Sequence, residues 1–202
     1  MLDCLELSRR IRLGNNADPQ GLSIVPEPDL TEIEKSGEAS VSLRLGRWLV
    51  ALRQSSQPYF DVDTAPDKTR AEARAAKSYF VPFGEEFVLH PGRFVLASTL
   101  EWFRFPAGLA GYVTGKSTWA RRGLIIETAA GIHPGFSGCL TLELANVGEV
   151  PITIRPGMKI CQIFVHAVTN GKVLSGSPLS GRRRPFLGPP KVDSVFQKLR
   201  KA

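Results

Sequence analysis

Residues 115–143 read GKSTWARRGLIIETAAGIHPGFSGCLTLE, and the character of this stretch changes halfway along. The first half runs from the hydroxyl-rich segment Lys116–Thr118 through Arg121 to Gly123. Such a segment, closed by a glycine that tolerates left-handed backbone, predicts one short helical turn with a Ser or Thr cap. The second half alternates leucines with polar residues as far as Glu143, which predicts a strand.

The predicted turn favours a bound anion. Unpaired N–H groups at a helix start attract negative charge, Lys116 and Arg121 add positive charge, and Ser117 adds a neutral donor. A di- or triphosphate would fit this set. The full phosphate-loop pattern needs a glycine five residues before the Gly-Lys pair, and Gly111 does not have that spacing. The sequence therefore does not predict a Walker-type NTPase, and an ordinary capped turn with solvated arginines stays an alternative.

Glu143 is expected to share a strand face with Thr141, away from Leu140, Leu142 and Leu144. A carboxylate on that face is either a solvated strand residue or a general acid/base directed into a cleft. The alternation alone leaves both interpretations open.

The rest of the chain has the pattern of a mainly β domain. From Phe87 onward, short runs of Val, Ile, Leu, Phe and Thr are separated by turns such as Pro-Gly. Strands at intervals of about eight to twelve residues predict a barrel or jelly-roll-like fold with a few short helices. Upstream, residues 5–13 predict an amphipathic helix and residues 41–50 a strand. Residues 65–77 are polar and alanine-rich, and predict a surface helix or an excursion between strands.

The composition is that of a soluble domain. The 202 residues are 43% hydrophobic and 22% charged, which is enough to bury one core. No long apolar run is present, so we expect no membrane segment and a cytoplasmic location, and three cysteines without framework spacing suit a reducing compartment. We divide the chain into a domain, residues 1–174, and a flexible basic tail, residues 175–202. Because much of the +7 charge lies in this tail and no basic segment is interleaved with aromatics, nucleic-acid binding is not predicted.

Three motifs resemble those of the dCTP deaminase branch of the dUTPase superfamily. They are GKSTWARRGLI from Gly115, IHPGFSGCLTLELANVG from Ile132 and PITIRPGMKICQIFV from Pro151, in the order and near the spacing of that family. The similarity extends over residues 5–166. It implies a dUTPase-like distorted β-barrel of the β-clip type, and a homotrimer whose active sites lie between subunits.

The resemblance also implies an activity, the hydrolytic deamination of dCTP to dUTP and ammonia without zinc. The sequence agrees about zinc, because zinc deaminases need a Cys-x-x-Cys pair, which Cys4, Cys139 and Cys161 do not form. Mg²⁺ is expected only as a companion of the triphosphate, and dTTP as an effector. One alternative is a dUTPase, or a bifunctional deaminase and diphosphatase that gives dUMP. The other is a nucleotide-binding paralogue with altered catalysis.

By motif position, the resemblance assigns proton transfer to Glu143, which would take a proton from the water that attacks C4 of cytosine. Ser117 and Arg121 would complete the catalytic set by positioning that water and the base. His133 stands where the family has an Asp that contacts the deoxyribose. The implied substrate-binding residues are Lys116, Ser117, Thr118, Arg121, Thr128, Ala129, His133, Thr141, Leu142 and Gln162.

Overall fold

The computed structural model describes residues 1–52, 76–127, 131–169, 171–173 and 180–185. Its helices are α1 (Cys4–Asn15), α2 (Leu30–Ser36) and α4 (Ser117–Ala120). Its strands are β1 (Ser23–Val25), β2 (Val41–Leu52), β3 (Ala76–Phe80), β4 (Phe87–Leu89), β5 (Phe94–Arg104), β6 (Leu109–Gly115), β7 (Leu124–Glu127), β8 (Gly131–Ile132), β9 (Ser137–Asn146), β10 (Ile152–Ile154) and β11 (Lys159–Ala167).

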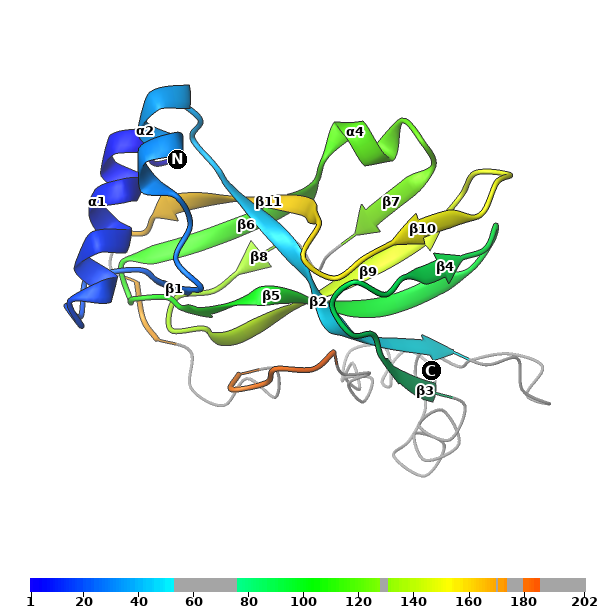
Figure 1. The fold of residues 1–202 in the computed structure, drawn as a ribbon. Coiled ribbons are helices and arrows are strands. Elements are labelled where there is room, and N and C mark those ends of the chain that lie inside the picture. Colours follow the sequence, from blue (N-terminus) through cyan, green and yellow to red (C-terminus); the bar gives the residue numbers. More distant parts are fainter. Residues whose placement is uncertain (53–75, 128–130, 170, 174–179, 186–202) are drawn as a thin grey trace, which may run out of the picture.

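The strands form a curled half-barrel, with α1 and α2 packed together at one end (Figure 1). The main sheet has the order β7-β9-β5-β2-β11-β6-β8, while β1 pairs with β5 and β3 pairs with β2. A separate two-stranded sheet joins β10 to β4. All of these pairs are antiparallel. The prediction of a mainly β fold with a few short helices is confirmed.

The long elements follow their sequence patterns. The predicted helix over residues 5–13 is α1, which begins where the Asp3 side chain accepts a hydrogen bond from the Glu6 backbone N–H at 2.8 Å. Its apolar stripe, Leu7 and Ile11, is fully buried. The predicted strand over residues 41–50 is β2, in which buried residues alternate with partly exposed ones over its first half.

Other expectations are met only in part. Of the segment 65–77, residues 65–75 lie outside the described residues, and Ala76 and Lys77 begin β3 rather than a helix. No sequence pattern had indicated α2 or β1. None of the helices in the described residues is long and apolar enough to cross a bilayer.

A short C-terminal segment, residues 180–185, is attached to the sheet. The Gly181 N–H donates to the Ser137 carbonyl at 2.6 Å, and the Cys139 N–H donates to the Arg182 carbonyl at 2.8 Å. Residues 180–182 therefore bond to the part of the β9 edge that β7 leaves uncovered. The remaining predicted tail residues, 175–179 and 186–202, lie outside the described residues, so the domain boundary stays a prediction.

A buried carboxylate, Glu101, lies where the pairing of β5 with β9 changes register. Only 4% of its side chain is exposed, and its two oxygens accept hydrogen bonds from the Arg44 backbone N–H at 2.9 and 3.1 Å. The Arg44 guanidinium lies 3.6 Å away. Burial raises the pKa of the Glu101 carboxyl above its ordinary value of 4.5, against the opposing effect of these contacts.

We expect Glu101→Gln to gain stability relative to the wild type as the pH rises. A carboxyl whose pKa is higher in the folded state contributes its full stabilisation below pH 4.5 and loses it as the pH rises through the folded pKa. Glutamine does not titrate, so the difference in unfolding free energy should change by at most about 1.4 kcal/mol per pH unit in that window. Urea unfolding at a series of pH values measures it, with the exposed Glu85→Gln as control. A difference in unfolding free energy between Glu101→Gln and the wild type that does not change with pH would contradict this expectation.

Candidate active site

The short turn α4 stands at the end of β6. The Lys116 N–H donates to the Ile160 carbonyl of β11 at 3.3 Å, and the Arg121 N–H donates to the Ser117 carbonyl at 3.0 Å. Lys116 occupies the cap position and its side chain makes no capping bond, so the predicted Ser or Thr cap is wrong. The physical reason is that pairing with β11 holds the chain through Lys116, and Ser117 is already the first helical residue. Gly123 has φ of 86°, the left-handed backbone that was predicted to end the turn.

The polar side chains of the turn face outward. Ser117, Thr118 and Arg121 are exposed, and Lys116 is half-buried. Trp119 fixes the turn from its other side, because its indole N–H donates to the Lys159 carbonyl at 2.8 Å while its ring packs against the core. The turn therefore presents two cations and two hydroxyls on a base that is anchored to β11.

Gln162 lies on the strand next to this turn. It stands opposite Thr114 of β6 and is half-buried. Its side-chain oxygen is 3.5 Å from the Ser40 hydroxyl. A hydrogen bond within the protein thus accounts for at least one of its polar atoms.

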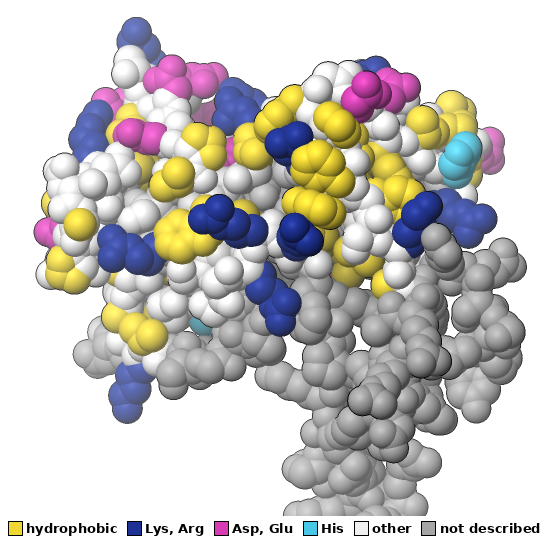
Figure 2. Space-filling model, turned by 60° about the horizontal axis from the view of Figure 1, so that its bottom comes forward, with side chains coloured by type: hydrophobic (Ala, Val, Ile, Leu, Met, Phe, Trp, Pro, Cys, Tyr) yellow, Lys and Arg dark blue, Asp and Glu magenta, His cyan; other side chains and the backbone are white. Residues whose placement is uncertain are grey.

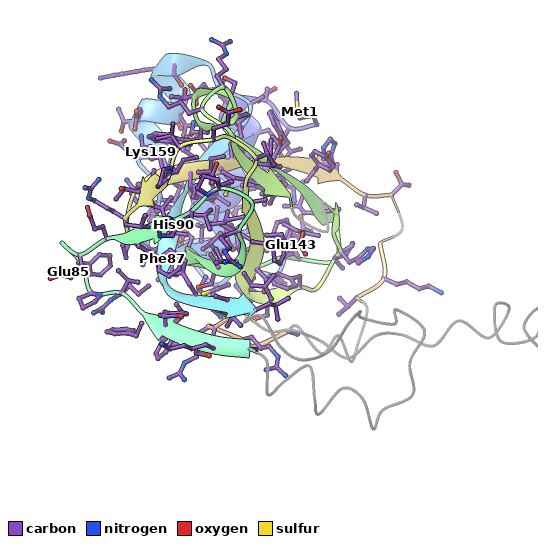
Figure 3. The ribbon with its side chains drawn as sticks, turned by 90° about the vertical axis from the view of Figure 1, so that its right-hand side faces the viewer. Met1, Glu85, Phe87, His90, Glu143 and Lys159 are labelled. Carbon is purple, nitrogen blue, oxygen red and sulfur yellow. The ribbon has the colours of Figure 1, made fainter. Side chains whose placement is uncertain are left out.

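Glu143 lies on the outer face of β9. Glu143 and Thr141 are half-buried, whereas Leu140, Leu142 and Leu144 are buried, as the alternation predicted. The Leu142 side chain is 0% exposed, so only its backbone is left for contact with a ligand. Figure 3 labels Glu143 on β9, well separated from Glu85 on the other side of the ribbon.

On the β5 side, the neighbours of Glu143 across the sheet are apolar. Leu96 of β5 stands directly opposite Glu143, and Val50 of β2 stands opposite Leu96. Residues opposite one another in antiparallel strands share a face. Since Leu96 and Val50 are 5% and 9% exposed, the carboxylate lies beside a poorly hydrated surface. A general acid/base in such a place is shielded from bulk water on that side.

The strand register separates Arg121 from Glu143 within one chain. Leu124, at the start of β7, pairs with Asn146, and Glu127, at its end, pairs with Glu143. Arg121 lies in the turn before β7, three residues ahead of Leu124, so the register does not place it opposite Glu143. Within one chain, the two predicted catalytic residues thus belong to different elements that the register does not bring opposite one another.

His133 belongs to a third location, the turn between β8 and β9. It is exposed, and its carbonyl accepts a hydrogen bond from the Phe136 N–H at 3.2 Å. Thr128 and Ala129 lie outside the described residues. The structure therefore brings Lys116, Ser117, Thr118 and Arg121 together, with Gln162 on the adjacent strand, and holds Glu143 with Thr141 on a different surface.

The charge of the surface suits an anionic ligand. Lys and Arg side chains are spread among hydrophobic ones on the underside of the molecule (Figure 2). Some cations of the protein rest on aromatic rings: the Arg184 guanidinium lies 3.9 Å from the Trp48 ring centroid and that of Arg47 4.4 Å from the Phe80 centroid. A basic surface attracts polyanions over distances comparable with the screening length.

The two strand cysteines are suited to packing. Burial raises the pKa of the Cys161 thiol to about 12 and also raises that of Cys139. A thiol with a raised pKa is a poor nucleophile at neutral pH. Among the described residues, no three His, Cys, Asp or Glu side chains gather into a group that could hold a metal ion.

The curled half-barrel is a fold that this chain shares with a solved enzyme. The crystal structure of 2'-deoxycytidine 5'-triphosphate deaminase from Agrobacterium tumefaciens matches with a TM-score of 0.55 and 22% sequence identity. The match covers 78% of this chain and 45% of that one, so this chain spans less than half of that structure.

Sequence comparison identifies the family. A family model described as dCTP deaminase-like matches residues 16–168, and this chain belongs to that family of enzymes. "dCTP deaminase, dUMP-forming" of Corynebacterium diphtheriae is 41% identical over 154 residues, which are 73% of this chain and 79% of that protein. The protein of the same name from Mycobacterium tuberculosis is 51% identical over 109 residues, which are 50% of this chain and 57% of that protein. The family resemblance of the sequence motifs is thereby confirmed.

These comparisons correct one expectation. The motifs had been interpreted as those of a deaminase that releases dUTP, but the similar curated proteins are named for forming dUMP. They favour the alternative, a deaminase that also removes pyrophosphate. The motif positions could not separate the two, because deamination and triphosphate hydrolysis act on the same nucleotide.

Proposed function

We propose that this protein is a bifunctional deaminase that converts dCTP to dUMP, ammonia and pyrophosphate. The observation that supports it best is the extended similarity to proteins named for this reaction, at 41% identity over 154 residues. The outward-facing Glu143 and the cationic turn at α4 supply the two kinds of group that the reaction needs.

In this proposal Glu143 moves the protons. It would accept a proton from the water that attacks C4 of cytosine and return it to the ring and the leaving amine. Ser117 and Arg121 position the water and the base, and Lys116 and Thr118 bind phosphate oxygens. The remaining proposed substrate contacts are Thr128, Ala129, His133, Thr141, the Leu142 backbone and Gln162.

We further propose a homotrimer in which each active site takes residues from two copies. The register of β7 and β9, which does not place Arg121 opposite Glu143, supports this arrangement, because a second copy can place its own Arg121 beside Glu143. Heterologous contacts of this kind close into a ring when the rotation between copies is suitable.

Two accompanying proposals concern the setting of the reaction. Mg²⁺ binds together with the triphosphate as its counter-ion, because this ion prefers phosphate oxygens and water as ligands. The nucleotide dTTP acts as an effector. The protein works in the cytoplasm, which the three free cysteines Cys4, Cys139 and Cys161 support, since thiols persist in a reducing compartment.

The product distribution tests the proposed function. With dCTP and Mg²⁺ we expect ammonia and pyrophosphate to be released in equal amounts, with dUMP as the nucleotide product. One water is consumed at C4 and another at the phosphate that is cleaved. Separation of nucleotides by chromatography, with ammonia and pyrophosphate assays on the same samples, measures this. Ammonia release with dUTP as the final product would contradict bifunctionality, and the absence of any turnover would contradict the proposed enzyme.

A further inference from the structure

The last residue of β9, Asn146, is a buried polar side chain that bonds to two backbone segments, the end of β4 and the loop after β9. It is 0% exposed. Its amide nitrogen donates to the carbonyls of Leu89 and Val150, both at 2.9 Å, and its amide oxygen accepts from the Gly148 N–H at 2.9 Å. Both donors and one acceptor position of the amide are thus used inside the protein.

The bond to Gly148 leads to the turn that carries Arg121. The Val147 N–H donates to the Gly123 carbonyl at 2.9 Å, and a methyl group at Gly123 would lie 2.8 Å from the Gly148 nitrogen. The loop after β9 therefore rests directly on the backbone of Gly123. The Gly123 N–H in turn donates to the Ala120 carbonyl at 3.0 Å, so the contact continues into α4 without a flexible side chain between.

Asn146 is also connected to Glu143. The two residues belong to the same strand, and Asn146 pairs with Leu124, the first residue of β7. Its own backbone is held from the far side, because its N–H donates to the Arg93 carbonyl at 3.1 Å and its carbonyl accepts from the Gly92 N–H at 2.8 Å. The network of hydrogen bonds thus starts at the strand that carries Glu143, to which Asn146 is fixed, and it ends at the turn that carries Arg121.

We infer that Asn146 is a positioning residue, which fixes the place of the Arg121 turn relative to the strand that carries Glu143. This inference rests on the proposed function, in which both residues act on the substrate. In a homotrimer the same network fixes how each copy presents Arg121 to its neighbour. A misplacement of about 1 Å at reacting groups can cost about a hundredfold in rate.

Asn146→Asp is the most informative substitution. Aspartate has nearly the same shape, but its carboxylate cannot donate to the carbonyls of Leu89 and Val150, whereas its protonated form can donate once. Burial favours the protonated form, so the defect should diminish as the pH falls. We expect kcat to drop about tenfold to a hundredfold at alkaline pH with a smaller change in KM, and the ratio of variant to wild-type kcat to rise toward acidic pH.

The matched control is Asn16→Asp, which makes the same chemical change at the exposed C-cap of α1, far along the chain from both residues. Its kcat ratio should be independent of pH. If Asn146→Asp does not fold, Asn146→Ser replaces it: a small neutral side chain should lower kcat without recovery at any pH. An unchanged kcat in a folded Asn146 variant would overturn the inference.

A second readout separates this inference from the proposed function. Amide hydrogen exchange of folded Asn146→Asp at alkaline pH should show lost protection at Val147, Gly148 and Gly123, with little change at the Leu7 amide in α1. This result does not require any turnover. If the wild type fails to deaminate dCTP, the proposed function fails, and the exchange data still test the network. Unchanged protection at all three amides would show that Asn146 does not hold the turn.

Discussion

Replacing Glu143 with Gln is expected to lower the rate of dCTP deamination by about a hundredfold to ten-thousandfold, which is the usual contribution of a positioned general acid/base. The amide keeps the size and the hydrogen-bonding reach of the carboxylate but cannot accept a proton from the attacking water. The affinity for dCTP should therefore change much less than kcat. Ammonia release under saturating dCTP and direct binding of dCTP by calorimetry measure the two quantities.

The control for this substitution is Glu85→Gln, which removes a carboxylate from an exposed position on the other side of the ribbon (Figure 3). The Glu85→Gln variant should keep the wild-type rate of deamination and the wild-type affinity for dCTP. Deamination by Glu143→Gln at the wild-type rate would remove this residue from the mechanism, and with it the main chemical support for the proposed activity.

Mixing two inactive variants is expected to restore activity if each site is shared between copies. One variant is Glu143→Gln and the other is Arg121→Ala, each of which should be nearly inactive alone. In trimers assembled at random from equal amounts, about a quarter of the sites would combine an intact Glu143 with an intact Arg121 from the neighbouring copy. Deamination should therefore recover to about a quarter of the wild-type rate.

The mixed trimers are made by unfolding and refolding the two chains together, with each chain treated alone as a control. Differently tagged chains and purification over both tags confirm that mixed assemblies have formed. Mixed assemblies without activity would show that both residues of a site come from one chain. A protein that elutes as a monomer while deaminating dCTP would contradict the proposed homotrimer as a whole.

The sequence predicted the parts of the site that depend on local periodicity. The outward orientation of Glu143 and Thr141 follows from the alternation with leucines, and the structure confirms it. The left-handed backbone of Gly123 was likewise predicted from its place after the turn. The prediction of a Ser or Thr cap was wrong, because Lys116 occupies the cap position. A hydrogen bond from Lys116 to β11 decides where the turn begins, and no local sequence pattern contains that bond.

Two other features could not be predicted because they depend on pairing between distant segments. Glu101 occurs in a run of strand-forming residues, but it lies where β5 changes register with β9, and its buried carboxylate accepts a hydrogen bond from the Arg44 backbone N–H. In the sequence, Asn146 directly follows a predicted strand, where an Asn most simply starts a turn toward Gly148. Its bonds to Leu89 and Val150 depend on where β4 and β10 meet the end of β9. The signal that the sequence offers for such sites is an Asn or Glu within an otherwise apolar predicted strand.

Residues 180–182 cover part of a strand edge. β9 lies at one side of the main sheet, where β7 pairs with only its last residues, Glu143–Asn146. Residues 180–182 bond to its first residues, Ser137 and Cys139. Exposed strand edges are templates on which another chain can add a strand, and natural proteins shorten or cover them. By covering the start of β9, the returning C-terminal segment shortens the edge open to such pairing, and its loss would favour aggregation.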